Sequence, residues 1–182
     1  MAIHENLNIL ITCSADGLCM LYTLPYFKLY NSFIIGKDDK ENEKKEILTP
    51  DIVLISDKPL PCFIFYIELK RTIYFYSING CLLKKQILNF SIKENHINIY
   101  TDYQFVDYLI IFNSKKKTFD IYSIIDFELI GRSPSVPLGE LVDYILSKEM
   151  DHILILCKTE ENNNNKYKLY ILKDSDSLIL WK

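Results

Sequence analysis

The sequence predicts an all-β protein assembled from four similar units of β-strands, and three observations point to it. The chain has 27 isoleucines and only 2 alanines, so the best helix former is scarce and a β-branched residue is abundant. Of its 182 residues, 49% are hydrophobic, which is enough apolar material for a folded core. An apolar run followed by a tyrosine also recurs four times, which is typical of a repeat architecture.

Each copy of the repeat contains an apolar run of three residues, a polar turn and a second run that ends in tyrosine. In the first three copies Tyr22, Tyr76 and Tyr122 stand 13 residues after the first residue of the apolar run. In the fourth copy the distance to Tyr170 is 17, and the four asparagines at 162–165 account for the excess as an insertion at a hairpin tip. We therefore expect the four tyrosines at equivalent places on the third strand of four successive sheets.

The copies are predicted at residues 1–36, 47–90, 96–133 and 138–182. Two central strands flank the polar turn, and a fourth strand follows the tyrosine at 27–33, 81–88, 127–130 and 178–181. A strand before the apolar run is predicted only in copies two to four, at 51–56, 96–101 and 141–146. Residues 1–6 are too few and too polar to supply one, so the first unit is predicted to be incomplete.

Turn residues separate these strands. Asp16-Gly17 and Asn79-Gly80 stand between β-rich runs, and such pairs favour a type I′ hairpin turn with positive φ at both central residues. Nine of the ten residues at 37–46 are charged, four of them positive and five negative. A mixed run of this kind has neither a net field nor a hydrophobic face, so we expect a solvated loop.

The repeats resemble the degenerate WD40 repeats of β-propellers, and more narrowly the C-terminal WD repeats of BEACH-domain proteins. Ser14 to Tyr22 is similar to the SxDGxxxxW stretch of a WD repeat, with tyrosine in place of tryptophan. Residues 74–80 and 107–130 are similar to two successive blades of the BEACH-type propellers. The Gly-His and Trp-Asp pairs of well-formed WD repeats do not occur in this sequence.

The resemblance implies a β-propeller with about four blades of four antiparallel strands, which is the smallest ring that propellers form. We expect a partial propeller, completed by blades from a parent chain, a protein partner or a second copy, because open blades leave apolar faces and edges uncovered. The implied function is a non-catalytic scaffold for protein–protein interaction in BEACH-type vesicle and membrane trafficking. The alternatives are a four-bladed propeller with a ligand or catalytic pocket at its central channel, and a β-sandwich, which would not explain the constant spacing.

No pattern in the sequence points to an enzyme, a metal or a cofactor. Nucleophile-elbow, Walker, dinucleotide and zinc-protease motifs do not occur, and only five glycines are present to build a phosphate loop. His4, His96 and His152 are far apart and have no cysteine or acidic neighbours at ligand spacing. The five cysteines are an odd number without a CxxC pair, which predicts reduced core thiols in a cytoplasmic protein.

The net charge of −3 gives no general attraction for nucleic acid. The sequence contains neither a signal-peptide pattern nor an 18-residue apolar run, so no membrane span is predicted. Two basic clusters are our candidate surface contacts, at equivalent hairpin tips of copies two and three: Lys70, Arg71, Lys115, Lys116 and Lys117. They are either weak peripheral contacts to anionic lipid or solvated ends that discourage edge pairing.

Overall fold

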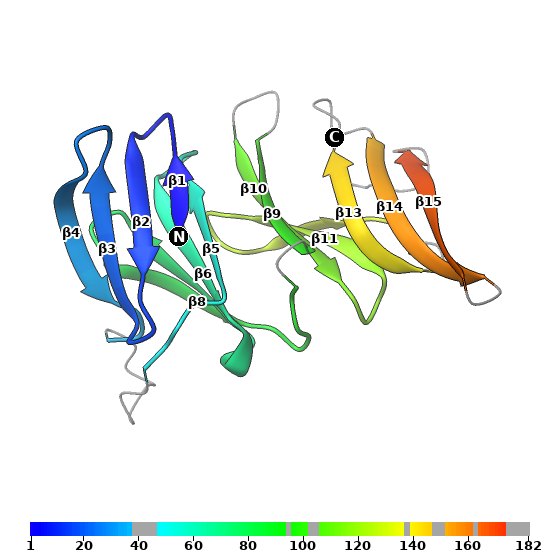
Figure 1. Ribbon diagram of the computed structural model, residues 1–182, viewed down its shortest axis with the longest axis horizontal. Coiled ribbons are helices and arrows are strands. Elements are labelled where there is room, and N and C mark those ends of the chain that lie inside the picture. The colour runs from blue at the N-terminus through cyan, green and yellow to red at the C-terminus, as the bar shows by residue number, and fades with distance from the viewer. Residues whose placement is uncertain are drawn as a thin grey trace. The chain divides into compact units, whose positions relative to one another are not determined.

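A computed structural model of the chain describes residues 1–37, 47–93, 96–101, 106–136, 139–146, 152–161 and 164–173 (Figure 1). These residues contain no α-helix and form four antiparallel sheets whose strands follow one another in chain order. The first sheet contains β1 (Ala2–His4), β2 (Ile9–Cys13), β3 (Leu18–Thr23) and β4 (Lys28–Ile34). The second contains β5 (Ile52–Ser56), β6 (Cys62–Ile67), β7 (Thr72–Ser77) and β8 (Leu82–Ile87).

The third sheet contains β9 (Ile97–Thr101), β10 (Asp107–Asn113), β11 (Thr118–Ser123) and β12 (Leu129–Arg132). The fourth contains β13 (Glu140–Leu146), β14 (His152–Glu161) and β15 (Asn164–Lys173). The all-β prediction is confirmed, and the predicted strands agree with these bounds to within two residues. The strand predicted at 178–181 and the charged residues 38–46 lie outside the described residues.

The prediction that the first sheet lacks its first strand is wrong. Ala2, Ile3 and His4 form β1 and pair with Ile11, Leu10 and Ile9 of β2. Three residues suffice because a ladder is held by backbone hydrogen bonds, which polar neighbours in the sequence do not prevent. The side chain of Ala2 packs against the core, so the first copy of the repeat forms a complete four-stranded sheet.

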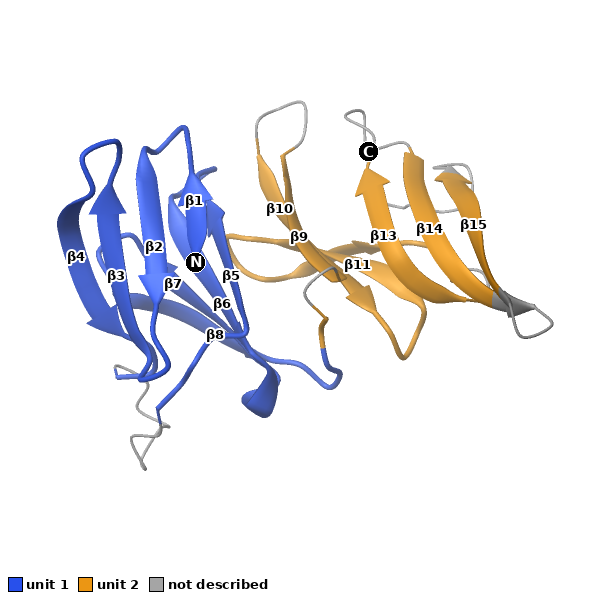
Figure 2. Ribbon diagram, viewed as in Figure 1, with its two compact units in different colours: residues 1–91 blue, residues 92–182 orange. Residues whose placement is uncertain are grey.

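The chain forms two compact units, residues 1–91 and 92–182 (Figure 2). In unit 1 the first and second sheets share one apolar core, in which the rings of Phe33 and Tyr76 stack with centroids 5.2 Å apart. In unit 2 the third and fourth sheets share a second core, in which the rings of Phe119 and Tyr144 lie 4.7 Å apart. Each unit therefore contains two sheets packed on each other, with aromatic side chains between them.

The four repeat tyrosines lie on the third strand of their sheets, in β3, β7, β11 and β15, as predicted. A feature that the spacing did not predict accompanies the first three. The pairing with the outer strand shifts register immediately before the tyrosine, and the tyrosine then pairs with a leucine: Tyr22 with Leu29, Tyr76 with Leu82 and Tyr122 with Leu129. A bulge at this position bends the outer strand and makes its edge a poorer template for pairing.

The inserted asparagines of the fourth copy lengthen its central hairpin. β14 and β15 have ten residues each, and their ladder continues to the pair Glu161 and Asn164. Tyr170 consequently pairs with Ile155, the third residue of its apolar run, whereas Tyr76 pairs with Phe63, the first residue of its run. Asn164 and Asn165 thus extend the strand pairing.

The two predicted hairpins exist, but their type I′ turns do not. Gly17 and Gly80 have φ values of 77° and 79°, whereas Asp16 and Asn79 keep negative φ. The backbone N–H of each glycine donates to the carbonyl three residues earlier, Ser14 at 3.0 Å and Ser77 at 2.9 Å. This is a type I turn followed by a left-handed glycine. At Gly80 a Cβ atom would lie 2.6 Å from Cδ1 of Phe33, so the packing also requires glycine there.

Candidate functional site

The first basic cluster lies at the tip of the β6–β7 hairpin. This tip is a single 3₁₀ turn, η1 (Glu68–Lys70), which ends at Arg71 in the left-handed conformation with φ 48°. The Arg71 N–H donates to the Glu68 carbonyl at 3.0 Å, and the Arg71 carbonyl accepts from Leu88 N–H at 2.8 Å. The turn is therefore closed by a hydrogen bond and anchored through Arg71 to the chain after β8, while Leu69, which precedes the two basic residues, is 91% exposed.

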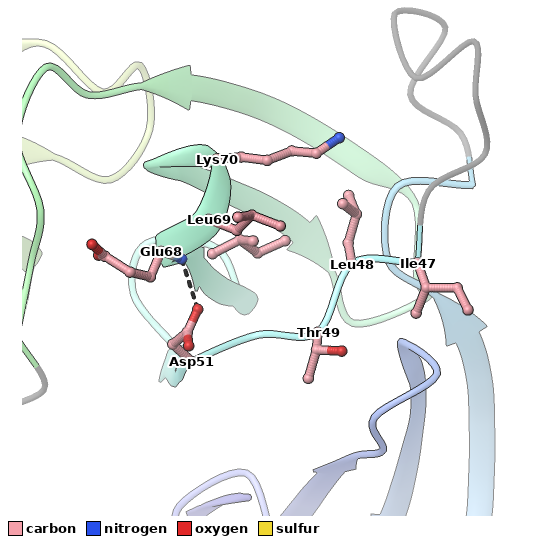
Figure 3. A pocket seen from close by; sticks show the side chains of 8 residues that line it. Ile47, Leu48, Thr49, Asp51, Glu68, Leu69 and Lys70 are labelled. Atoms are coloured by element: carbon pink, nitrogen blue, oxygen red, sulfur yellow. Dashed lines mark hydrogen bonds between the residues drawn. The ribbon is translucent and has the colours of Figure 1, made fainter.

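An apolar pocket of about 710 Å³ lies beside this tip (Figure 3). Its lining comes from η1, the end of β6 and the segment before β5, and comprises Ile47, Leu48, Thr49, Asp51, Ile67, Glu68, Leu69 and Lys70. Leu48 and Ile67 are buried, whereas Ile47 is largely exposed. The pocket has the chemistry to hold an aliphatic or aromatic side chain, with the Lys70 ammonium at its margin.

The acidic side chains of the pocket are already engaged by the protein. The Asp51 carboxylate accepts from the Glu68 N–H at 2.7 Å, which satisfies the first N–H of η1. The Tyr66 hydroxyl donates to the Glu68 carboxylate at 2.5 Å. In Figure 3 Glu68 points away from Leu48, whereas Leu69 lies between them. The apolar groups are consequently the part of the pocket that remains available to a ligand.

The second basic cluster lies at the tip of the β10–β11 hairpin, where Lys115, Lys116 and Lys117 are exposed. The buried Asn113 carboxamide accepts from the N–H groups of Lys115 and Lys116, both at 3.2 Å. Lys117 takes the left-handed conformation with φ 57°, and its carbonyl accepts from Val136 N–H at 2.6 Å.

The two basic tips are therefore equivalent, as predicted. Arg71 and Lys117 occupy the same left-handed position, and the carbonyl of each is bound by a buried aliphatic residue that follows its outer strand. Gly17 holds this position in the first sheet, where its carbonyl accepts from Ile35 N–H at 3.1 Å. The tips of copies two and three belong to different compact units, and their contact with lipid stays a prediction.

The fourth sheet has an exposed apolar face that sequence analysis missed. One face of this sheet packs on the third sheet through Tyr144, Ile153 and Ile155. On the opposite face the cross-strand pairs form rows: Ile145, Leu154 and Ile171, then Asp143, Leu156 and Leu169, then Lys158 and Tyr167. We call this set the outer face of the fourth sheet. Its five large side chains at positions 145, 154, 167, 169 and 171 are 37–66% exposed.

An ion pair between a buried carboxylate and a partly exposed arginine, also missed, lies in the third sheet. Asp120 is 1% exposed, and its carboxylate accepts from Arg132 at 2.6 Å (Nε) and 3.1 Å (Nη2). Thr118 and Asn113 also donate to it, at 3.0 and 3.2 Å. Burial alone would raise the pKa of Asp120, but the hydrogen bonds from Arg132, Asn113 and Thr118 outweigh it and lower that pKa. Burial and the neighbouring Asp120 charge raise the pKa of Tyr122 to about 12.

His4 and His96 belong to different compact units. His96 is buried edge-on against the Phe112 ring at 5.0 Å, and burial together with the Lys93 charge lowers its pKa, which favours the neutral imidazole. His4 Nδ1 accepts from Leu7 N–H at 3.4 Å. In the part of the chain that the structure describes, no three His, Cys, Asp or Glu side chains gather as metal ligands would. Among the same residues, no helix has the length and apolar character needed to cross a membrane.

Comparisons with known proteins identify the fold. No protein-family model matches the chain, and no curated protein matches its sequence. The fold is similar to that of BBS1N, a β-propeller, in a crystal structure of BBS1N in complex with ARL6DN. The TM-score is 0.57 at 11% sequence identity, and the match covers 92% of this chain and 48% of the BBS1N chain.

The chain is thus β-propeller-like in fold, as the repeats predicted, and it spans about half the length of this neighbour. At 11% identity the likeness concerns the fold alone. The β-sandwich alternative is wrong, because the four sheets are successive meanders of the propeller type.

Proposed function

We propose that this protein is a non-catalytic scaffold that binds other proteins through the outer face of its fourth sheet. The observation that carries the proposal is the composition of that face: two cross-strand rows with five aliphatic side chains, followed by Tyr167 opposite Lys158. Exposed apolar side chains that are contiguous across neighbouring strands mark interaction surfaces, whereas scattered ones do not.

The partner that fits this face best is another antiparallel sheet, and the one that we propose is a second copy of this chain. The opposite face of the same fourth sheet already packs on a sheet, so its strands have the twist that sheet packing requires. The first sheet carries a complementary row on the face away from the unit 1 core, in which Ile3, Leu10, Tyr22 and Leu29 pair across four strands. The BBS1N chain is about twice as long as this chain, the length that two copies would supply.

Two finer roles extend this proposal. The resemblance to BEACH-type repeats supports a scaffold in vesicle trafficking, and the exposed lysines 115–117 support peripheral contact with anionic membranes at about 1 kcal/mol per lysine. The complex of BBS1N with ARL6DN supports protein partners for propellers of this kind. A ligand or catalytic pocket at a central channel stays an alternative prediction.

Charge placed on the outer face is expected to abolish self-association. We expect wild-type protein to sediment as a monomer when dilute and as a larger species when concentrated, and Leu169→Glu to remain monomeric, because a carboxylate cannot be buried unpaired between two sheets. Leu83→Glu is the matched control, since Leu83 is an exposed leucine on β8 of the second sheet. Sedimentation velocity measures all three proteins.

The control must associate like the wild type. A wild-type protein that stays monomeric at every concentration would contradict the choice of a second copy as partner. A Leu169→Glu variant that associates as well as the wild type would contradict the assignment of this face.

A further inference from the structure

Two cysteines face each other across the β2–β3 hairpin of the first sheet. Cys13 of β2 and Cys19 of β3 are direct cross-strand partners, and their Sγ atoms lie 2.7 Å apart in the reduced state. Ser14 N–H donates to the Leu18 carbonyl at 3.0 Å, so the next pair along the ladder is a non-hydrogen-bonded one. Residues in such a pair have Cα atoms about 4.5 Å apart, within the range of about 4.4 to 6.8 Å that disulfides span.

We propose that Cys13 and Cys19 form a reversible cross-strand disulfide when the protein meets a peroxide. The Cys13 thiolate attacks one peroxide oxygen, the O–O bond breaks, and a sulfenic acid and water form. The Cys19 thiol then attacks the sulfenyl sulfur, an S–S bond forms, and the second oxygen leaves as water. In sum two thiols are oxidised and one peroxide is reduced to two waters. Two molecules of a small thiol such as glutathione reverse the reaction and become its disulfide.

The surroundings assign a different role to each sulfur. Cys13 is partly exposed near the end of the hairpin, whereas Cys19 is fully buried. The hydrogen bond between the two thiols lowers the pKa of Cys13, against the opposing effect of burial, and the same contact raises the pKa of Cys19. Cys13 is therefore the thiolate that a peroxide reaches, and Cys19 is the thiol that resolves the sulfenic acid.

This hairpin touches the wall of the apolar pocket. The Thr49 hydroxyl donates to the Ala15 carbonyl at 2.6 Å, and a Cβ on Gly17 would lie 3.0 Å from the Leu48 carbonyl oxygen. Leu48 and Thr49 both line the pocket beside η1. A bond between Cys13 and Cys19 would fix the two strands that present this tip to the pocket wall.

The experiment uses the full chain, freshly reduced, exposed to hydrogen peroxide, quenched with catalase, denatured and alkylated with N-ethylmaleimide. Trypsin releases residues 1–28 as one peptide, which contains Cys13 and Cys19 and no other cysteine. We expect this peptide to carry two alkyl groups before peroxide treatment, and afterwards to carry none and to weigh two hydrogen atoms less than the unmodified reduced peptide. Reduction before alkylation should restore two alkyl groups.

Two variants test the assignment. Cys81→Ser, which removes an exposed cysteine outside the pair, is expected to form the bond as the wild type does. Cys13→Ser is expected to leave Cys19 open to alkylation after peroxide treatment. The wild-type peptide decides the question even if a variant fails to fold. Both thiols still alkylated, Cys13 converted to a sulfinic or sulfonic acid, or Cys13 joined to a different cysteine would each overturn the proposal.

Discussion

Replacing Tyr76 by alanine is expected to lower the free energy of unfolding of unit 1 by about 4 kcal/mol, the cost of removing a fully buried aromatic ring. Tyr76 has no exposed surface, and its ring contacts Phe33 at 5.2 Å and Phe65 at 5.7 Å. Its hydroxyl oxygen accepts from the Gly36 N–H at 2.7 Å, which links the chain after β4 to the second sheet. One side chain thus joins the two sheets of the unit.

Two control variants separate the contribution of the Tyr76 ring from that of its hydroxyl and from that of any repeat tyrosine. Tyr76→Phe keeps the ring and removes only the hydroxyl, so we expect a loss of about 1 kcal/mol. Tyr22→Ala removes the equivalent repeat tyrosine, which lies half-buried on the face of the first sheet away from the unit 1 core, and should cost less than Tyr76→Ala. Urea unfolding followed by circular dichroism measures the three variants. Equal losses for Tyr22→Ala and Tyr76→Ala would contradict the assignment of Tyr76 as the link between the sheets.

Removal of the Arg132 side chain is expected to lower the free energy of unfolding of unit 2 by about 3 kcal/mol, because a buried carboxylate loses its cation. Asp120 is almost completely buried, and Arg132 donates two hydrogen bonds to it, beside those from Asn113 and Thr118. Lys93→Ala is the matched control in the same unit. Lys93 and Glu140 pair at 2.9 Å, but both are about 60% exposed, so this loss should stay below about 1 kcal/mol.

The difference in free energy of unfolding between the wild type and Arg132→Ala should depend on pH. The pKa of Asp120 is lowered below its ordinary value of 3.8 in the folded wild type. Its ionised form therefore stabilises the fold above about pH 4, and this stabilisation is lost as the pH falls through the lowered pKa. In the variant the buried carboxylate has no cation beside it, so protonation stabilises the fold by removing an unpaired buried charge. The free energies of unfolding of the two proteins, measured between pH 7 and pH 3, should become more similar as the pH falls. A difference that stays constant or grows in acid would contradict this explanation.

The strands and the repeat were predictable from the sequence because both depend on local patterns. The runs around Tyr76 and Tyr122 are rich in β-branched and aromatic residues, and such runs indicate strands even when the partner strands are unknown. β1 was missed because a three-residue strand forms through backbone hydrogen bonds to a neighbouring strand. The side chains of Ala2–His4 are too few to show a strand pattern in the sequence. The turn type was missed because Asn-Gly and Asp-Gly suit more than one hairpin geometry.

The surfaces were harder to predict because they depend on contacts between strands. Residues 153–157 of β14 and 169–172 of β15 are apolar at consecutive positions, which is typical of strands that are covered on both faces. Cys13 and Cys19 stand symmetrically about Asp16, so their spacing could have indicated cross-strand partners. Nothing comparable indicates the pocket, whose walls are Leu48 and Leu69 from separate segments, or the pairing of Asp120 with Arg132 inside a sheet.

The measurement that tests the central claim most directly is hydrogen exchange of the full chain, read sheet by sheet at low and at high protein concentration. Strands with both neighbours in place and both faces covered exchange slowly, whereas an uncovered sheet opens more easily. We predict that the protection of β6, β7, β10 and β11 is the same at both concentrations, and that β13, β14 and β15 gain protection when the protein associates. A monodisperse monomer whose first and fourth sheets are as protected as the second and third would contradict the claim, and would favour the closed four-bladed propeller in its place.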